Sequence, residues 1–271
     1  MDQAPFQERQ FGPTPREARG HAIVIHGFTG APSDVWPVAQ VLGTRGLSVT
    51  VPCLRGHQAG TAGVGSATLE QWREDVLQAA RTAAEHKPGP VYCVGFSMGA
   101  LLVLDLATRS DIPIAAVAAL APPLALGPLG RHVSALVSRA PWLKDAALRK
   151  RGGPDISNGT PLPGAPALPL RGIHQLYRLM DDVRAALPSL KTPLLVLHGR
   201  LDHTAPVAGA YALARTATAA SPMRIVILER SFHVITRDVE ATRVAREVGD
   251  FFERQLTRTH AQRPETSDRR R

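Results

Sequence analysis

The sequence predicts an α/β fold, with a mostly parallel central sheet flanked by helices and a mainly helical cap inserted before the last two strands. Three observations predict it. Short apolar runs alternate with stretches of helical periodicity, the runs are nearly continuous in their hydrophobicity, and one long segment between two runs has no such run. Near-continuous apolar runs are typical of parallel strands that are covered on both faces.

Six apolar runs predict the strands of this sheet. Each is short and rich in β-branched or other apolar residues, and the chain shows no internal repeat. The runs span residues 21–28, 47–54, 90–97, 114–123, 192–202 and 223–233. Strands that alternate with helices favour a parallel arrangement, because a helix must return the chain to the start of the next strand.

Helical patterns fill the intervals between these runs. Apolar residues recur at helical spacing over residues 34–44, 68–85, 98–108, 207–219 and 239–256. The helix over 68–85 begins with the sequence Thr68-Leu-Glu-Gln71, which matches a capping box. In that motif the two side chains bond to backbone N–H groups that the first helical turn leaves free.

The segment 122–190 interrupts the alternation. It holds helical stretches around 128–151 and 172–187, separated by the proline- and glycine-rich RGGPDISNGTPLPGAPALPL, and it contains no convincing strand. Ligands bind at the carboxyl ends of parallel strands, so an insertion there would roof a pocket.

These boundaries predict the organisation of the chain. The core comprises residues 20–121 and 191–256, and the cap subdomain comprises residues 122–190. A flexible lead of residues 1–19 and a disordered basic tail of residues 257–271 complete the 271 residues.

Composition supports one sizeable core, since 44% of the 271 residues are hydrophobic. No apolar run approaches the roughly 20 residues that span a bilayer. The first residues have no apolar centre of a secretory signal, so we expect a cytoplasmic protein. Cys53 and Cys93 lie within or at the end of apolar runs, which predicts buried free thiols rather than a disulfide framework.

The net charge of +9 is unevenly distributed. The cap carries nine Lys and Arg against four Asp and Glu, and residues 254–271 carry six against two. A nucleic-acid-binding protein would gather basic and aromatic residues on its recognition fold, so we expect no nucleic-acid partner. The basic residues indicate a solvated surface, with weak contact to an anionic membrane through the cap or tail as the alternative. No feature of the sequence sets an oligomeric state.

The stretch Gly95-Phe96-Ser97-Met98-Gly99 lies between a predicted strand and a predicted helix. The Gly-x-Ser-x-Gly pattern alone fits an ordinary tight turn. Between a strand and a helix, however, the turn forces the serine into a strained backbone conformation and exposes its hydroxyl above the sheet. A side chain at either glycine would strike the neighbouring helix or strand. The context therefore favours Ser97 as a nucleophile.

A serine nucleophile needs a base, and the base needs an acid that orients it. In folds with this turn the order along the chain is serine, acid, histidine. Asp202 and His233 each follow a late predicted strand, and we predict that they form a triad with Ser97. Asp238 is the alternative acid, although it fits better as the N-cap of the last helix. The competing histidines are poorly placed for the role of base: His174, His203 and His260.

Acyl transfer also requires N–H donors for the developing oxyanion. The N–H of Met98, which follows the nucleophile, is one candidate. The N–H of Phe28 is the other, because His26-Gly27-Phe28-Thr29-Gly30 follows an early strand and its glycines let the backbone turn inward. The ring of Phe28 would then line the acyl pocket. We expect His26, and likewise His57, to brace loops by hydrogen bonds.

Four segments carry a resemblance to the α/β-hydrolase superfamily and, within it, to small bacterial serine carboxylesterases and monoacylglycerol lipases. The segments are HGFTG (26–30), GFSMG (95–99), HGRLDHTAP (198–206) and SFHVITRD (231–238). The resemblance implies an α/β-hydrolase fold, a triad and an oxyanion hole at the residues named above.

The helix over 172–190 resembles the last cap helix of that family, whose apolar residues face the substrate. This resemblance implies that Leu176, Leu179 and Met180 line the pocket with Phe28. No metal-ligand spacing, phosphate-binding loop or dinucleotide fingerprint is present, so we expect neither a metal nor a cofactor.

Together these features predict a serine hydrolase that cleaves short- to medium-chain acyl esters or monoacylglycerols through an acyl-enzyme on Ser97. A serine nucleophile argues against the dehalogenases and epoxide hydrolases of the same fold, in which an aspartate attacks. The alternatives are an acyltransferase or thioesterase with the same triad and, from another class, a non-catalytic ligand-binding protein on a hydrolase scaffold.

Overall fold

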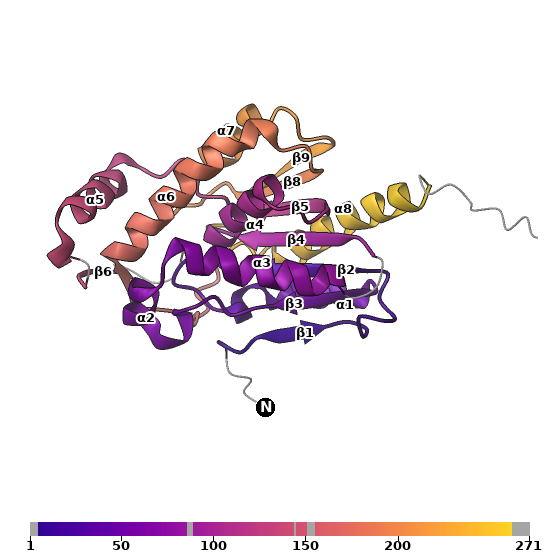
Figure 1. Cartoon of the computed structure of the whole chain (residues 1–271), viewed down its shortest axis with the longest axis horizontal. Coiled ribbons are helices and arrows are strands. Elements are labelled where there is room, and N and C mark those ends of the chain that lie inside the picture. The colour runs from indigo at the N-terminus through magenta and orange to yellow at the C-terminus, as the bar shows by residue number, and fades with distance from the viewer. Residues whose placement is uncertain (1–4, 86–88, 144, 151–154, 262–271) are drawn as a thin grey trace, which may run out of the picture.

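A computed structural model describes residues 5–85, 89–143, 145–150 and 155–261. Its centre is a seven-stranded sheet with the order β1-β3-β2-β4-β5-β8-β9, covered by helices on both faces (Figure 1). All neighbouring strands are parallel except β1, which pairs antiparallel with β3. The predicted α/β-hydrolase class, with a mostly parallel sheet flanked by helices, is confirmed.

Each of the six predicted runs forms a strand of this sheet. These six strands are β2 (Gly20–Ile25), β3 (Leu47–Val51), β4 (Val91–Phe96), β5 (Ile114–Leu120), β8 (Leu194–Gly199) and β9 (Met223–Leu228), and the seventh strand, β1 (Arg9–Phe11), lies outside the predicted runs. The six strands end before the predicted runs end, because apolar residues continue into the turns that follow. These turns hold the candidate site.

The helices of the described residues lie between the strands and after the last one. They are α1 (Trp36–Thr44), α2 (Gly60–Ser66), α3 (Leu69–Glu85), α4 (Met98–Arg109), α5 (Pro128–Arg139), α6 (Leu170–Ala186), α7 (Ala208–Thr216) and α8 (Ala241–Ala261). The capping box at the start of α3 forms as predicted. The Gln71 N–H donates to Thr68 Oγ1 at 3.2 Å, and the Thr68 N–H donates to Gln71 Oε1 at 2.9 Å.

The core consists of two apolar layers, one on each face of the sheet. Successive residues of a strand point to opposite faces, so Ile23 packs in one layer while Val24 packs in the other. The first layer joins the sheet to α3, α4, α6 and α7, and the second joins it to α1 and α8. Because the strands are buried on both sides, their hydrophobicity is continuous.

The structure differs from the prediction at both ends of the chain. Residues 1–19 were expected to be a flexible lead, but Arg9–Phe11 forms β1 and pairs with β3. Pairing satisfies the N–H and C=O groups of an exposed sheet edge, which composition does not reveal. At the other end α8 continues to Ala261, into residues expected to be tail. Residues 1–4 and 262–271 lie outside the described residues.

The cap segment, residues 122–190, also differs in part. The predicted helix over 128–151 ends at Arg139, and a short antiparallel pair forms between β6 (Ala147–Arg149) and β7 (Ala167–Pro169) where no strand was expected. Three-residue strands are too short for a period-two pattern to be recognised. In Figure 1, α5 lies at the left edge of the view and α6 crosses above the sheet.

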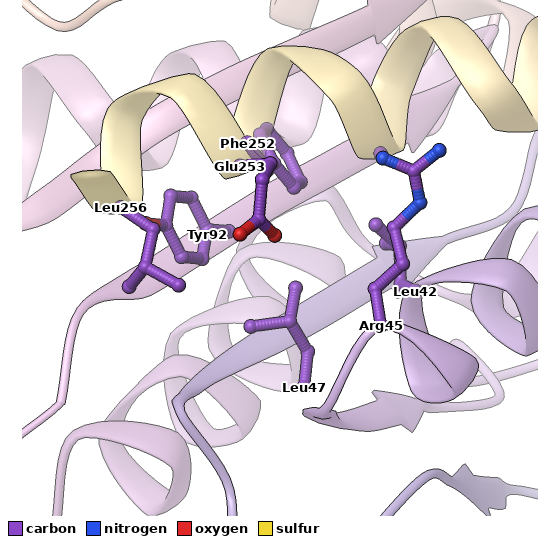
Figure 2. Close-up of a pocket in the computed structure, with 8 residues that line it drawn as sticks. Leu42, Arg45, Leu47, Tyr92, Phe252, Glu253 and Leu256 are labelled. Carbon is purple, nitrogen blue, oxygen red and sulfur yellow. The ribbon is translucent and has the colours of Figure 1, made fainter.

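A small hollow lies on the face of the sheet that α1 and α8 cover, between the sheet and α8. Figure 2 shows the ring of Tyr92 and the carboxylate of Glu253 facing it. Its volume is about 10 Å³, the size of a single water. The Tyr92 ring stacks on Phe252 with centroids 4.6 Å apart, while its buried hydroxyl bonds to no described residue. This hollow is far too small for a substrate.

A larger groove of about 330 Å³ lies between α3 and the C-terminal half of α4. Its lining includes Leu102 and Arg109 but none of the predicted site residues. Within the described part of the chain, no helix combines the length and apolarity needed to cross a bilayer.

Candidate active site

Ser97 occupies the sharp turn between β4 and α4. Its backbone has φ 53° and ψ −118°, a conformation that non-glycine residues rarely adopt. The Ser97 N–H is held by Leu120 O of β5 at 2.8 Å. A side chain at Gly95 would meet the Gly99 carbonyl, and one at Gly99 would meet the Ile25 carbonyl. Both glycines are therefore required by close backbone approach.

Of the three predicted triad side chains, His233 lies within hydrogen-bonding distance of both Ser97 and Asp202. His233 Nε2 is 3.0 Å from Ser97 Oγ, and His233 Nδ1 is 2.8 Å from Asp202 Oδ2. With Nδ1–H donating to Asp202, Nε2 is free to accept the Ser97 hydroxyl proton. This tautomer is the one that general-base catalysis needs. The three residues follow β4, β8 and β9, whose carboxyl ends share one edge of the sheet.

The Asp202 carboxylate accepts four hydrogen bonds. Oδ1 accepts the N–H of Thr204 at 2.9 Å and that of Ala205 at 2.6 Å. Oδ2 faces His233 Nδ1 and, at 3.1 Å, His198 Nε2. Burial alone would raise the pKa of Asp202, but hydrogen bonds from both histidines and from the Ala205 N–H outweigh it. The pKa of this carboxyl therefore lies well below its ordinary value, and Asp202 is ionised.

His198 is a functional candidate that the sequence reasoning missed. Its side chain is fully buried in β8, and its Nε2 also lies 2.7 Å from the carbonyl of Ala205. Since a carbonyl only accepts, Nε2 must carry the proton that both oxygens share. The signal was present in the sequence, as a histidine four residues before the acid in HGRLD.

Asp238, the alternative acid, has other partners. Its Oδ2 accepts the N–H of Phe232 at 2.8 Å, and its Oδ1 accepts from Ser157 and from the Val239 N–H. The side chain thus holds loop backbone together and makes no hydrogen bond to His233. It does not cap α8 either, although its main-chain carbonyl accepts the Ala241 N–H at 2.9 Å.

The competing histidines also have partners away from Ser97. The ring of His174 lies 3.0 Å from Ser134 Oγ within the cap segment. His203 is exposed, and its Nδ1 lies 3.4 Å from Asp155. The side chain of His260 lies outside the described residues. Among these histidines, His233 is therefore the base candidate that the geometry favours.

The predicted oxyanion loop lies directly against the nucleophile. A Cβ placed on Gly27 would be 3.1 Å from the Cβ of Ser97. Met98 is the first residue of α4, so its N–H has no acceptor one turn earlier in the helix. The Met98 side chain, unassigned by the sequence, is fully buried in the core. The Met98 N–H therefore lies beside Ser97 at the N-terminus of α4, a position that favours a negatively charged oxygen.

His26 braces the predicted oxyanion loop by hydrogen bonds, as expected. Its Nδ1–H donates to Gly27 O at 3.1 Å, and its Nε2 accepts the Leu54 N–H at 3.1 Å. Burial, with the nearby His57 ring, lowers the pKa of His26 well below its ordinary value. The neutral ring therefore holds both bonds. His57 lies 3.1 Å from Leu54 O and supports the same turn.

The ring of Phe28 lies between the core and the cap segment. It meets Trp72 edge-on with centroids 6.2 Å apart, and a side chain at Gly172 of α6 would touch it at 2.8 Å. Leu176, Leu179 and Met180 pack in the same apolar layer. Leu179 and Met180 have no accessible surface, so an acyl chain reaches them only if α6 shifts.

Comparison with known proteins places these features in a family. The family described as "Serine aminopeptidase, S33" matches residues 16–240. A thermostable monoacylglycerol lipase of Bacillus sp. (strain H-257) is 26% identical over 242 residues, covering 85% of this chain and 89% of that protein. A carboxylesterase of Bacillus subtilis is 22% identical, covering 86% of this chain and 92% of that protein.

Solved structures show the same fold. One from a study of the metagenome-derived lipolytic enzymes LipS and LipT has a TM-score of 0.83, with 23% identity over 92% of this chain and 98% of that chain. A monoglyceride lipase of Saccharomyces cerevisiae has a TM-score of 0.75, with 15% identity over 92% of this chain and 91% of that chain.

Proposed function

Because the chain belongs to the serine aminopeptidase S33 family and has the α/β-hydrolase fold, we propose that it is a serine hydrolase that cleaves carboxylic esters through an acyl-enzyme on Ser97. The observation that carries the proposal is the hydrogen-bonded series from Asp202 through His233 to Ser97. Its relatives include lipases and carboxylesterases that match most of the chain, which supports an ester substrate.

In the first half of the reaction, His233 Nε2 takes the Ser97 proton as Oγ attacks the ester carbonyl. Asp202, ionised in its buried site, stabilises the imidazolium that forms. The N–H groups of Phe28 and Met98 hold the oxyanion of the tetrahedral intermediate. His233 then gives its proton to the leaving alcohol, and the acyl group remains on Ser97.

The second half of the reaction releases the acid. His233 accepts a proton from water, and the resulting nucleophile attacks the acyl-enzyme carbonyl. The same two amides stabilise the second oxyanion, and the proton returns to Ser97 as the carboxylic acid leaves.

The proposed substrates are short- to medium-chain acyl esters or monoacylglycerols. The partly exposed ring of Phe28 and the nearby Leu176 of α6 provide a hydrophobic environment for the acyl chain, and Leu179 and Met180 would join them only after a shift of α6. The proposed location is the cytoplasm, and no nucleic-acid partner is proposed.

A weak contact with anionic membrane surfaces is also proposed, and the exposed side chains of the cap segment are the argument for it. Several large apolar side chains are exposed on or near α5: Leu129, Leu136, Trp142 and Leu148. The exposed Arg139 lies between two of these residues in the sequence, and the exposed Arg149 directly follows Leu148. Apolar and basic side chains together are the combination that binds anionic lipid surfaces. Cosedimentation with anionic and with neutral vesicles tests this contact.

Labelling with a fluorophosphonate probe tests the nucleophile. The wild-type protein should be labelled at Ser97, and Ser97→Ala should be unlabelled and lose turnover while its melting temperature stays nearly unchanged. A folded wild-type protein that resists labelling would favour a non-catalytic binding role. A large fall in melting temperature for Ser97→Ala would instead indicate that Ser97 is chiefly a structural turn residue.

A substrate panel tests the reaction class. We expect hydrolysis of p-nitrophenyl and glyceryl esters, with a rate that depends on acyl chain length. Acyl transfer or thioester cleavage that outruns ester hydrolysis would point to the same triad in another reaction. Because the family description names an aminopeptidase, aminoacyl p-nitroanilides belong in the panel, and a preference for them would overturn the ester proposal.

A further inference from the structure

Part of the cap segment contacts the loops that carry the candidate acid and base. We call residues 155–165 the cap strap. Its first residue, Asp155, accepts three hydrogen bonds at Oδ2: from the N–H of His203 at 2.9 Å, and from the N–H and hydroxyl of Thr204, each at 2.8 Å. These two residues directly follow Asp202, so Asp155 restrains the loop backbone immediately after the candidate catalytic acid.

Asp155 and Asp202 share a donor. The N–H of Thr204 lies 2.8 Å from Asp155 Oδ2 and 2.9 Å from Asp202 Oδ1. The side chain of Asp155 is largely shielded from water, with 14% of its area exposed. Hydrogen bonds to a shielded carboxylate are stronger than those between neutral groups. Asp155 therefore restrains the same peptide group that orients Asp202.

The backbone of Asp155 reaches the second loop. Its carbonyl accepts the N–H of Val234, the residue after His233, at 3.1 Å. One residue of the cap strap thus bonds to the loop of the acid and to the loop of the base. The relative position of Asp202 and His233 depends on both loops.

The rest of the cap strap continues along the same edge of the sheet. Ile156 is buried in the apolar layer that also holds Val234, and the Asn158 amide donates to Arg237 O at 3.0 Å. At its far end, the Ala165 N–H donates to Thr29 O at 2.9 Å, within the predicted oxyanion loop. The strap therefore contacts three loops that converge on Ser97.

We propose that Asp155 is a positioning residue, which sets the geometry of Asp202 and His233 from the cap segment. The inference rests on the proposed serine hydrolase function. The alternative role for Asp155 is to attach the cap and thereby hold long acyl chains. The two roles differ in which kinetic constant changes and for which substrate.

The test compares Asp155→Ala and Asp155→Asn on p-nitrophenyl acetate and p-nitrophenyl octanoate. Misplacing a catalytic group by about 1 Å costs on the order of 100-fold, so we expect Asp155→Ala to lower kcat roughly 10- to 100-fold for both esters, with KM nearly unchanged. Asparagine keeps an oxygen for the three donors. Asp155→Asn should therefore restore most of the lost kcat.

Asp181→Ala is the matched control. Asp181 pairs with Arg131 and Arg184 within the cap segment and contacts neither catalytic loop. Its removal loosens α5 against α6 and should leave kcat on p-nitrophenyl acetate at the wild-type value. Melting temperatures of all variants show whether each is folded.

Several results would overturn the proposal. One is an Asp155→Ala enzyme with wild-type kcat on both esters. Another is a loss confined to KM on octanoate, which would assign Asp155 to cap attachment. If Asp155→Ala fails to fold, Thr204→Val, which removes one of the three donors, should lower kcat severalfold, and an unchanged kcat would refute the positioning role. A wild-type protein inactive on every ester would contradict the proposed function itself, which is a different outcome.

Discussion

Two buried carboxyl groups, Asp202 after β8 and Asp34 after the predicted oxyanion loop, differ in how many hydrogen bonds they accept. Both residues are at least nine-tenths shielded from water, with 7% and 4% of their areas exposed. Asp202 accepts four hydrogen bonds, two of them from histidines. Asp34 Oδ2 accepts the Ala31 N–H at 2.9 Å, and its Oδ1 bonds to no described residue.

The pKa values of the two groups move in opposite directions. That of Asp202 is lowered, whereas burial raises that of Asp34 from 3.8 to about 6 despite the Ala31 N–H and the charges of Arg237 and Lys150. Similar burial therefore gives opposite outcomes, and the number of donors decides between them. The donors are concentrated at the carboxylate that faces His233.

Asp202→Asn removes the charge of the first carboxyl group and should have the largest effect, which is on kcat. An asparagine amide facing Nδ1 would force that nitrogen to accept, leaving the proton on Nε2, where it blocks transfer from Ser97. We expect kcat to fall about 10⁴-fold, equivalent to roughly 5 kcal/mol. Steady-state kinetics measure this fall, and a loss below tenfold would show that Asp202 does not orient the base.

Asp34→Asn tests the other carboxyl through stability. The folded pKa of about 6 exceeds the ordinary 3.8, so the stability that Asp34 contributes is fully present below about pH 4 and is lost as the pH rises through 6. A shift of about two units corresponds to about 3 kcal/mol. The variant lacks this titration, so its free energy of unfolding relative to wild type should rise between pH 4 and 7.

Urea unfolding at several pH values measures this difference. Because every other titrating group is common to both proteins, the difference isolates Asp34. A difference that is flat with pH would mean that Asp34 ionises normally in the folded state, and that its missing donors have no consequence.

His198→Ala removes one of the four donors from Asp202 and leaves the carbonyl of Ala205 unpaired. We expect kcat to fall roughly tenfold, or about 1.4 kcal/mol, at every acyl chain length, with a loss of stability of about 1–3 kcal/mol. His198→Gln, which keeps an N–H donor, should recover part of both. The control is His132→Ala on exposed α5, and equal effects of the two alanine variants on kcat would remove His198 from the site.

Tyr92→Phe should have the smallest effect. The Tyr92 hydroxyl is buried beside the hollow under α8 without a described partner, so its removal breaks no such bond. The stack on Phe252 remains. We expect a change in unfolding free energy below about 1 kcal/mol and unchanged kinetics. A loss of 2 kcal/mol or more in thermal or urea unfolding would show that this hydroxyl is hydrogen-bonded in solution.

The sequence predicted the sheet and the meeting of Ser97, Asp202 and His233 because both depend on strong local signals. A strand buried on both faces needs a continuous apolar run, and residues that follow parallel strands meet at one edge of the sheet. The predicted runs overran the strands because Phe28 in the first loop and Phe232 in the last are apolar as well. Side-chain chemistry in those loops, rather than hydrophobicity, marks where the strands end.

The features that were missed depend on contacts distant in sequence. The helix α2 has the sequence GTAGVGS, whose glycines disfavour a helix, and it forms where Gly65 packs closely against Pro169 of the cap segment. The cap strap looked irregular because of its prolines and glycines. Its order comes from Asp155 and Asn158, which bond to loops about 50 to 80 residues away. No local pattern encodes such pairs.

The cap strap has a consequence for how this chain can diversify. An inserted cap is often regarded as a module that can be exchanged to alter specificity while the core stays constant. Here residues 155–165 lie inside the inserted segment but are bonded to the core. Asp155 bonds to the loops after β8 and β9, and Ala165 bonds to the loop after β2. Recombination that exchanges residues 122–150 preserves these joints, whereas exchange of the whole segment breaks them. A cap exchange designed to alter substrate range should therefore retain residues 155–165 together with the core.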